Sequence, residues 1–503
     1  MVERRGNSSL IPLDIQAGMI SDITNYAAAG TWWTGDAVRF QDGLVEKIGG
    51  WNRRVPGAWT GTPCALHFWL DLNQQPRWFV GTTTGTWLVD ASGVVTQVTH
   101  SPSPPSPQAW SFDNWGEDII MVSRGGAIQY YDTSAGTRTP LSSTAGAANV
   151  PAVATEILVD PELRYVLVFG AAPFGSSTQD KMLIRWPNRG TTNNFTPGPD
   201  TTAGGTRLPY GSEILTAARM RREVVVFTDE ILYSGTAGGS AVWNFTPLGP
   251  VSLIGPRAKA VCSDGVVRWM GTDGFYSYDG RVNIVDCMVE DRIYDDLNRL
   301  VASQRVCAVD NSLFNEIWWS YPSAGSSVND RYAIYNYRDG TWATGSAVKR
   351  DAWYSTPSRD TPFGVSVKGL FDHEVGTDDT DDGSAAPIYS WARSTPLEVP
   401  PGDTIMSISQ LIPDITFRQT SSFFEPTLNF RVAGANYPGS AYSADQTRPV
   451  EDLGPGVDVR AFTDKLDLRV RGRKMTLQVA NDQIGVFWRL GRNRIRVKLD
   501  GSR

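Results

Sequence analysis

The sequence is poor in the residues that build metal centres and disulfide frameworks. It holds 4 cysteines and 3 histidines among 503 residues. The cysteines lie far apart without C-x-x-C spacing, and no histidine has a second histidine or a cysteine at ligand spacing. These residues are Cys64, Cys262, Cys287 and Cys307, and His67, His100 and His373. We therefore expect free thiols in a reducing compartment, no metal site and no cofactor.

Long apolar runs and a positive net charge are also missing. No stretch of 18 apolar residues occurs, so we expect no membrane-spanning segment. The residues after Met1 include no apolar run long enough for a signal peptide, which favours a soluble protein. The net charge of −7 argues against a generic nucleic-acid-binding protein with a basic face.

A repeated strand pair is the main pattern that the sequence does contain. Its first copy runs from Trp78 to Asp90 as an apolar run, a glycine-containing turn and an aromatic-rich strand that ends in aspartate. Further copies span 119–132, 224–233 and 266–279, and a degenerate copy spans 317–337. Repeats about 40 to 60 residues apart are typical of a β-propeller with one sheet per blade.

The repeated strands are apolar on both faces. Trp78 and Val80 point one way and Phe79 points the other, so both faces need covering. A blade packed between two neighbouring blades meets that need. After about residue 404 the pattern changes to alternating apolar and polar residues, as in 428–432, 466–470 and 495–499. That alternation is typical of strands with one solvated face and predicts a β-sandwich.

These patterns predict an all-β chain with few helices. We expect an N-terminal entry segment over 1–40, a β-propeller of six or seven blades over 41–400 and a C-terminal β-sandwich domain over 401–503. The strand from Leu44 to Trp51 is expected to complete the last blade and close the ring. One helix is expected from Glu290 to Ser303, where apolar residues recur at helical spacing.

The opening of the chain contains a longer pattern. Leu13 to Met19 (LDIQAGM) is followed by Trp33 to Trp51 (WTGDAVRFQDGLVEKIGGW), which has the form R-F-x-x-G-L-x-x-K-x-G-G-W near its end. Shorter motifs follow in order at 225–233, 255–276, 471–477 and 488–491. Together they resemble the tail hub (nozzle) proteins of short-tailed bacteriophages, which include the packaged DNA stabilisation proteins.

That resemblance implies a structural virion protein without catalytic residues. Such a protein forms a homohexameric ring below the portal adaptor, the head-to-tail connector protein, and anchors tail fibre or tailspike proteins. Packaged double-stranded DNA passes non-specifically through its central channel, so the ring retains and then conducts the genome. The implied location is the tail of the virion, after synthesis in the host cytoplasm.

Enzyme signatures are weak. Asp273-Gly274-Phe275-Tyr276 and Asp339-Gly340-Thr341-Trp342 partly match the Asp boxes of sialidase propellers, but ordinary Asp-Gly turns explain them better. Glycoside hydrolysis needs two facing carboxylates, and the sequence singles out no pair. We therefore expect no catalytic, cofactor-binding or metal-binding residues. The alternatives are a glycan-binding or glycan-cleaving propeller and a non-viral scaffold or adhesin.

Two charged segments leave alternatives open. The acidic stretch from Asp372 to Asp382 has enough carboxylates to hold Ca²⁺, but a solvated loop is favoured. From Val457 to Arg503 there are twelve Lys or Arg against five Asp or Glu, about +7, which leaves about −14 for the rest of the chain. The cations of these strands could contact DNA, contact a neighbouring subunit or simply face water. A subunit contact or a solvated face is favoured, because a genome that has to slide through a channel should not be bound tightly by its wall. Their cations are Arg469, Arg471, Arg473, Lys474, Arg492, Arg494, Arg496 and Lys498.

Overall fold

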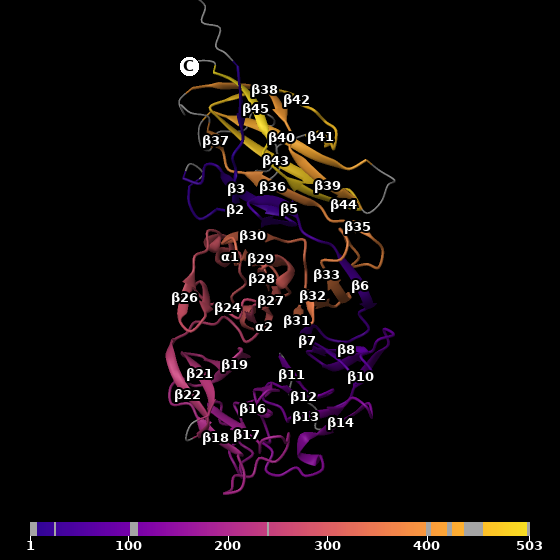
Figure 1. Cartoon of the computed structure of the whole chain (residues 1–503), viewed down its shortest axis with the longest axis vertical. Coiled ribbons are helices and arrows are strands. Elements are labelled where there is room, and N and C mark those ends of the chain that lie inside the picture. Colours follow the sequence, from indigo (N-terminus) through magenta and orange to yellow (C-terminus); the bar gives the residue numbers. More distant parts are fainter. Residues whose placement is uncertain are drawn as a thin grey trace, which may run out of the picture.

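Strands dominate the structure. A computed structural model describes residues 8–24, 27–100, 109–238, 241–398, 404–419, 425–436 and 456–499. In the view of Figure 1, a propeller forms the lower part of an elongated molecule and a layered β domain forms the upper part. The strands β2 (Gln16–Met19), β3 (Thr31–Asp36) and β5 (Leu44–Lys47) lie where the two parts meet.

Seven four-stranded antiparallel sheets within the described residues form the propeller. Each sheet is one blade, and the first strands of successive blades pack side by side around the axis. The first three blades are β7 (Pro63–Leu70), β8 (Pro76–Thr82), β9 (Gly85–Val89) and β10 (Val95–Val98); β11 (Trp110–Trp115), β12 (Asp118–Ser123), β13 (Gln129–Asp132) and β14 (Thr137–Pro140); and β15 (Glu156–Asp160), β16 (Tyr165–Phe169), β17 (Leu183–Trp186) and β18 (Gly204–Arg207).

Blades four to seven continue the same order. They are β19 (Ile214–Arg219), β20 (Val224–Thr228), β21 (Ile231–Gly238) and β22 (Ala241–Pro250); β23 (Lys259–Val261), β24 (Val267–Met270), β25 (Phe275–Tyr278) and β26 (Val282–Val285); β27 (Cys307–Asn311), β28 (Glu316–Tyr321), β29 (Arg331–Asn336) and β30 (Thr341–Gly345); and β31 (Ala352–Thr356), β32 (Arg359–Ser366), β33 (Gly369–His373) and β6 (Trp51–Pro56). The short 3-10 helices are η1 (Leu141–Ser143) and η2 (Ser312–Phe314).

The repeated pairs seen in the sequence are the middle strands of the blades. The pair from Trp78 to Asp90 forms β8 and β9, and the other copies fall at the same place in their blades. Every residue of β16 and β20 is buried, as expected for strands covered on both faces. The fold class is therefore confirmed, with seven blades.

Ring closure uses a different strand from the one predicted. The outermost strand of blade seven is β6, which pairs with β33 so that His373 lies opposite Trp51. The predicted closing strand, Leu44 to Trp51, contributes only its last residue. Its first part is β5 (Leu44–Lys47), which pairs with β4 (Val38–Gln41) through a tight turn at Asp42 and Gly43, both with positive φ.

The second domain contains both ends of the described chain. Sheet A has the order β1 (Ser9–Pro12), β45 (Arg494–Leu499), β38 (Met406–Ile412) and β42 (Leu466–Gly472). Sheet B has the order β2 (Gln16–Met19), β3 (Thr31–Asp36), β36 (Ser390–Ser394), β43 (Lys474–Asn481), β40 (Thr427–Ala435) and β41 (Val457–Arg460), with β37 (Leu397–Glu398) also on β43. Sheet C has the order β39 (Ile415–Gln419), β44 (Val486–Leu490), β5 and β4. A two-stranded sheet, β34 (Asp378–Asp379) with β35 (Ala386–Pro387), lies beside β6.

The boundaries therefore differ from those expected. Residues 9–47 are not an entry segment, because β1, β3 and β5 pair with strands from beyond residue 389. The propeller is inserted between β5 and β36. One strand also lacks the expected solvated face, because all eight residues of β43 are buried.

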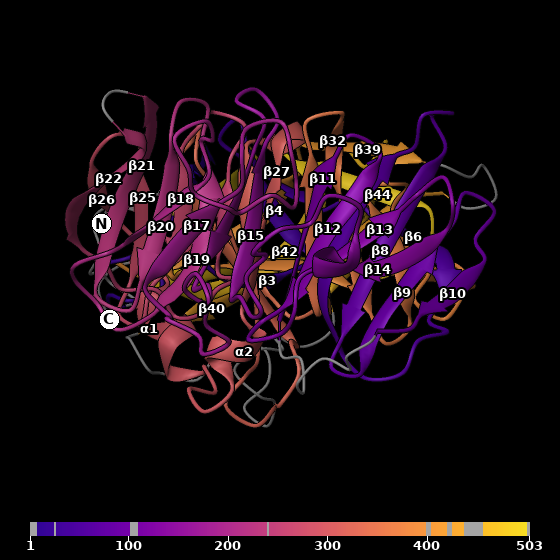
Figure 2. The same cartoon turned by 90° about the horizontal axis from the view of Figure 1, so that it is seen from below.

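The predicted helix is divided in two. The structure has α1 (Glu290–Asp295) and α2 (Ala302–Arg305), and Figure 2 shows both on one side of the propeller. Between them, Leu297 forms a β-bridge with Ser323, so the chain turns away and Leu300 is 91% exposed. The first turn of α1 is capped from elsewhere, since the backbone N–H of Glu290 donates to Asp22 at 2.5 Å.

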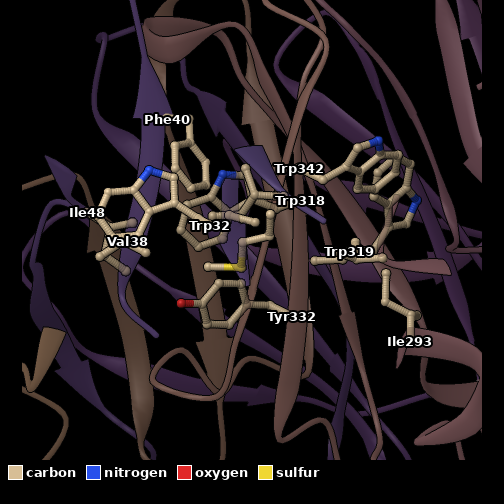
Figure 3. Close-up of a cluster of buried hydrophobic side chains, with 14 of the residues drawn as sticks. Trp32, Val38, Phe40, Ile48, Ile293, Trp318, Trp319, Tyr332 and Trp342 are labelled. Carbon is tan, nitrogen blue, oxygen red and sulfur yellow. The ribbon is translucent and has the colours of Figure 1, made fainter. Parts of the chain in front are cut away.

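A buried apolar joint connects the two domains. Figure 3 shows Trp32, Val38, Phe40 and Ile48 from the N-terminal strands beside Trp318 and Tyr332 of blade six. Polar contacts align this joint: the hydroxyl of Tyr332 accepts from the N–H of Ala37 at 2.9 Å and donates to Asp36 at 3.1 Å. The large rings make the joint part of one continuous core.

Arg39 is the charged centre of the joint. It is 1% exposed, and its Nη1 donates to Glu374 Oε2 at 3.1 Å while Nη2 donates to Glu374 Oε1. Its Nε lies 3.1 Å from Oε1 of fully buried Glu316, and its guanidinium lies over the ring of Phe314. Glu374 also accepts from Asn311 and from the N–H of Gly49. One cation of sheet C thus binds blades six and seven.

Replacing Arg39 is expected to destabilise the protein strongly. Arg39→Met leaves the carboxylates of Glu316 and Glu374 buried without their cation, which costs about 3–5 kcal/mol in comparable pairs. Urea unfolding measures the loss. Arg338→Met is the matched control, because the Arg338 pairs with Asp42 and Asp339 lie at the surface and are worth at most about 1 kcal/mol. Equal losses for the two variants would contradict this account of the joint.

Glu316 gives the joint a pH dependence. Burial raises its pKa to about 7, although the charge of Arg39 opposes the shift. Because the folded pKa lies above the unfolded one, near 4.3, the contribution of Glu316 to stability is complete below about pH 4 and is lost as the pH rises through 7. We expect the stability of wild type relative to Glu316→Gln to fall between pH 5 and pH 8, as measured by urea unfolding at both values. A constant difference would contradict the raised pKa.

Candidate functional site

Two adjoining cavities lie along the axis of the propeller. A narrow part of about 250 Å³ lies at the start of the innermost strands, and a wider part of about 830 Å³ lies at their ends. The innermost strands are the first of each blade, so every blade contributes to the lining. Six residues line both parts and mark the level at which they meet: His67, Phe112, Lys259, Ala308, Trp353 and Tyr354.

Two opposite charges, Glu156 of blade three and Lys259 of blade five, line the narrow part. The carboxylate of Glu156 accepts from the hydroxyl of Thr216 at 3.0 Å and from the N–H of Ala217 at 3.2 Å. Burial raises the pKa of Glu156, and the charge of Lys259 opposes that rise. Burial likewise lowers the pKa of Lys259, and Glu156 opposes that fall. Each charge thus offsets part of the cost of burying the other.

Two arginines cross the narrow end. Arg124, which follows β12 of blade two, donates to the carbonyls of Ile214 and Leu215 of blade four at 3.2 and 2.8 Å. Arg257, which precedes blade five, donates to the carbonyl of Asp351 before blade seven at 2.8 Å. Each side chain passes over one intervening blade. These contacts link non-adjacent blades at the narrow end of the axis.

Carboxylates are spread around the wide mouth. Asp113 pairs with Arg219 at 3.6 Å and accepts from the N–H of Val159, while Asp310 accepts from Tyr337 and from the N–H of Ser263. Burial raises the pKa of Asp310 to about 6. The other acids at the mouth are Asp160, Glu162 and Asp360. Across the described residues, no three His, Cys, Asp or Glu side chains lie close enough together to hold a metal ion.

The acidic segment from Asp372 to Asp382 contacts cations of the closing blade, so it is not a solvated loop. Asp381 accepts from the fully buried Arg350 at 2.9 Å and, with Asp379, from the indole of Trp51. Asp372 pairs with Arg54 at 3.0 Å and also with Arg359. The segment therefore fastens β6 to blade seven.

The cations of the C-terminal strands fall into two groups. Arg469, Arg471, Arg494, Arg496 and Lys498 point outward from β42 and β45 on sheet A. Two others are used internally: buried Lys474 pairs with Glu398 at 2.7 Å, and Arg492 pairs with Asp14 at 2.6 Å. Burial lowers the pKa of Lys474 to about 8.

The sequence alone does not reveal the axial pair. Glu156 and Lys259 belong to different blades and become neighbours only when the ring closes. A signal was present at one position, since Glu156 directly precedes the fully apolar run Ile157-Leu158-Val159. Once the order of the blades is known, a charged residue at the start of an innermost strand can be recognised as a candidate lining residue of the axis.

Comparisons with known proteins bear on the fold alone. No protein-family model matches the sequence, and no curated protein is similar to it. Among solved structures, the chain is similar to YCF48 from Cyanidioschyzon merolae at 8% identity and a TM-score of 0.40, over 64% of this chain and 98% of that one. Virginiamycin B lyase from Staphylococcus aureus matches at 9% and 0.41, over 64% and 98%. The extracellular domain of BT3049 from B. thetaiotaomicron matches at 9% and 0.42, over 86% and 61%.

Membrane spans can also be assessed from the helices. In the described part of the chain, none of them has the length and apolarity that crossing a bilayer requires.

Calcium is expected to leave the stability unchanged. The carboxylates of Asp379 and Asp381 are already occupied by Trp51 and Arg350, so an added cation has to displace those donors. We expect the same melting temperature in millimolar CaCl₂ and in EDTA, by differential scanning calorimetry. Arg350→Met is the positive control, because it removes the buried partner of Asp381 and lowers the melting temperature. A rise of several degrees with calcium in wild type would contradict this assignment.

Proposed function

We propose that the protein is the tail hub, or nozzle, of a short-tailed bacteriophage. In this proposal six copies form a ring below the portal adaptor, conduct the packaged double-stranded DNA and anchor tail fibres or tailspikes. The role is structural, and no residue of the chain acts as a catalyst. The proposal starts from the opening motif, whose resemblance to such proteins is described above.

One observation carries the proposal: the motif residues form the joint between the two domains. The stretch from Trp33 to Trp51 supplies most of β3, the β4–β5 hairpin and the start of β6. Its arginine is Arg39, and its last residue is Trp51, which binds the acidic segment of blade seven. A motif devoted to holding two domains in a fixed orientation suits a rigid building block of an assembly.

The axis of the propeller is not the expected path for DNA. At about 30 Å³ per water, the 250 Å³ of its narrow part hold about eight waters. A duplex whose major groove alone is about 12 Å wide does not fit there. Arg124 and Arg257 also cross the end. A DNA channel of this protein therefore has to lie between subunits, which makes the ring a requirement of the proposal.

Electron microscopy tests the proposal directly. We expect six-fold rings with an axial hole in micrographs of virions whose tails react with antibodies raised against this protein. Purified protein incubated with the portal adaptor is expected to give the same rings, because docking supplies the template for assembly. Virions that lack the protein in their tails, or a stable monomer on the adaptor, would contradict the proposal.

A second candidate function is a glycan-binding or glycan-cleaving propeller. The observation that favours it is Asp310, a carboxyl at the wide mouth with a pKa raised to about 6, as a general acid requires. If this function holds, the protein releases reducing ends from bacterial surface polysaccharide, and Asp310→Asn abolishes the release. Wild-type protein without such release favours the hub.

A further inference from the structure

The outer face of sheet A is a concentrated basic surface. The inward residues Ile495 and Val497 are buried, so Arg494, Arg496 and Lys498 point outward from β45. On β42 the outward residues are Asp467, Arg469 and Arg471. The face thus carries five cations and one carboxylate. These five cations are called the basic face below.

The register arranges the cations in two rows. Both β45 and β42 pair with β38, so Ser407 lies opposite Lys498 on one side and Arg471 on the other. Rows two strand spacings apart are about 10 Å apart, and outward residues of one strand repeat every 6.8 Å or so. Between the rows lie Ser407, Ser409 and Gln410, whose side chains can bind phosphate oxygens as well.

The charge of the basic face is largely uncompensated. Arg496 donates to the neutral Gln410 at 2.9 Å. Arg469, Arg494 and Lys498 make no ion pair with another described residue. This contrasts with the buried cations Arg39 and Arg350, which have carboxylate partners. The basic face is therefore able to attract an external polyanion.

The composition of the face favours nucleic acid over protein as that polyanion. The centre of a protein interface is depleted in charge and enriched in aromatic residues, whereas sheet A has no aromatic residue in any of its four strands. Protein–DNA interfaces are more polar and far more positive. The face has serine, glutamine and arginine side chains but no helix or β-ribbon that could enter a DNA groove. Such a face suits contacts with the phosphate backbone of DNA, which carry no sequence information.

We propose that the basic face contacts the phosphate backbone of duplex DNA without sequence preference. This inference rests on the proposed function, because it assigns the surface that a passing genome meets. Contacts limited to phosphates are compatible with passage, since proteins bound in this way slide along DNA. The acidic remainder of the chain repels DNA and so confines the contact to this face.

Salt-dependent binding tests the inference. Fluorescence anisotropy measures the affinity of the full chain, assembled on the adaptor, for a labelled 30-base-pair duplex of random sequence at 50 and 200 mM salt. Arg471 already has another partner, so four cations are counted. Four neutralised phosphates give a slope of about −3.6, a loss of affinity of about 150-fold over this range. In the triple variant Arg494→Gln, Arg496→Gln and Lys498→Gln, Arg469 alone remains of these four and the loss shrinks to about 3.5-fold.

A matched triple variant controls for net charge. Arg164→Gln, Arg222→Gln and Arg281→Gln remove three exposed cations from the propeller, far from sheet A. This control is expected to keep the affinity and slope of wild type, and circular dichroism melting confirms that both variants are folded. Equal loss of binding in both triple variants would overturn the inference in favour of a general charge effect.

The outcomes separate the inference from the proposed function. If rings form normally but do not bind duplex DNA, the inference is wrong and the proposed hub function is unaffected. If the protein never forms rings but binds duplex DNA through the basic face, the proposed hub function is wrong and the inference is supported. If the basic-face variant loses ring formation and wild type binds no duplex, the face is a subunit contact and the inference is wrong.

Discussion

The structure depends on one buried cation at the place where three sheets meet. Arg39 reaches from sheet C to Glu316 at the start of β28 and to Glu374 after β33. A guanidinium with five donors in a plane can satisfy two carboxylates in fixed directions, which a lysine cannot do. Since an unpaired charge is costly at such depth, the domains have essentially one low-energy orientation. The apolar rings of Trp32, Trp318 and Tyr332 supply the attraction, and Arg39 supplies the alignment.

Topology reinforces this joint. The chain begins in sheet A, passes through sheets B and C, builds the whole propeller and returns to the same three sheets. The two domains are consequently connected by two stretches of backbone: one leads from β5 into β6 of blade seven, and the other leads from blade seven to β36. Because the propeller is held by two covalent connections and a shared core, it behaves as one rigid body with the three-sheet domain in which it is inserted. Such a body suits a role in which force or a long polymer acts on the molecule.

Local sequence patterns were sufficient to predict the propeller. They could not predict the pairing of strands that lie far apart in the sequence. Trp78 to Asp90 pairs within its own hairpin, so a single segment contains the whole signal. Short polar outer strands such as β18, with Gly204 and Gly205, carry no apolar pattern and resemble a loop. The strands β1, β3 and β5 have partners more than 340 residues away, as with Trp32 opposite Ser394, and no local feature of the sequence indicates this pairing. The basic face was visible as alternation in Arg494 to Leu499, but its partner row on β42 required the register of β38.

The late completion of blade seven has a consequence for synthesis on the ribosome. The strand β6 ends at Pro56, and the next strand of its blade begins at Ala352, about 300 residues later. At roughly 5–20 residues per second, a nascent chain waits about 15–60 s before this sheet can form. During that time β2 to β6 expose Trp32, Phe40 and Trp51 to the cell without partners. We therefore expect chaperones to bind the N-terminal part of the nascent chain during translation. The propeller and the three-sheet domain then complete their folding together, when the last strands emerge from the ribosome.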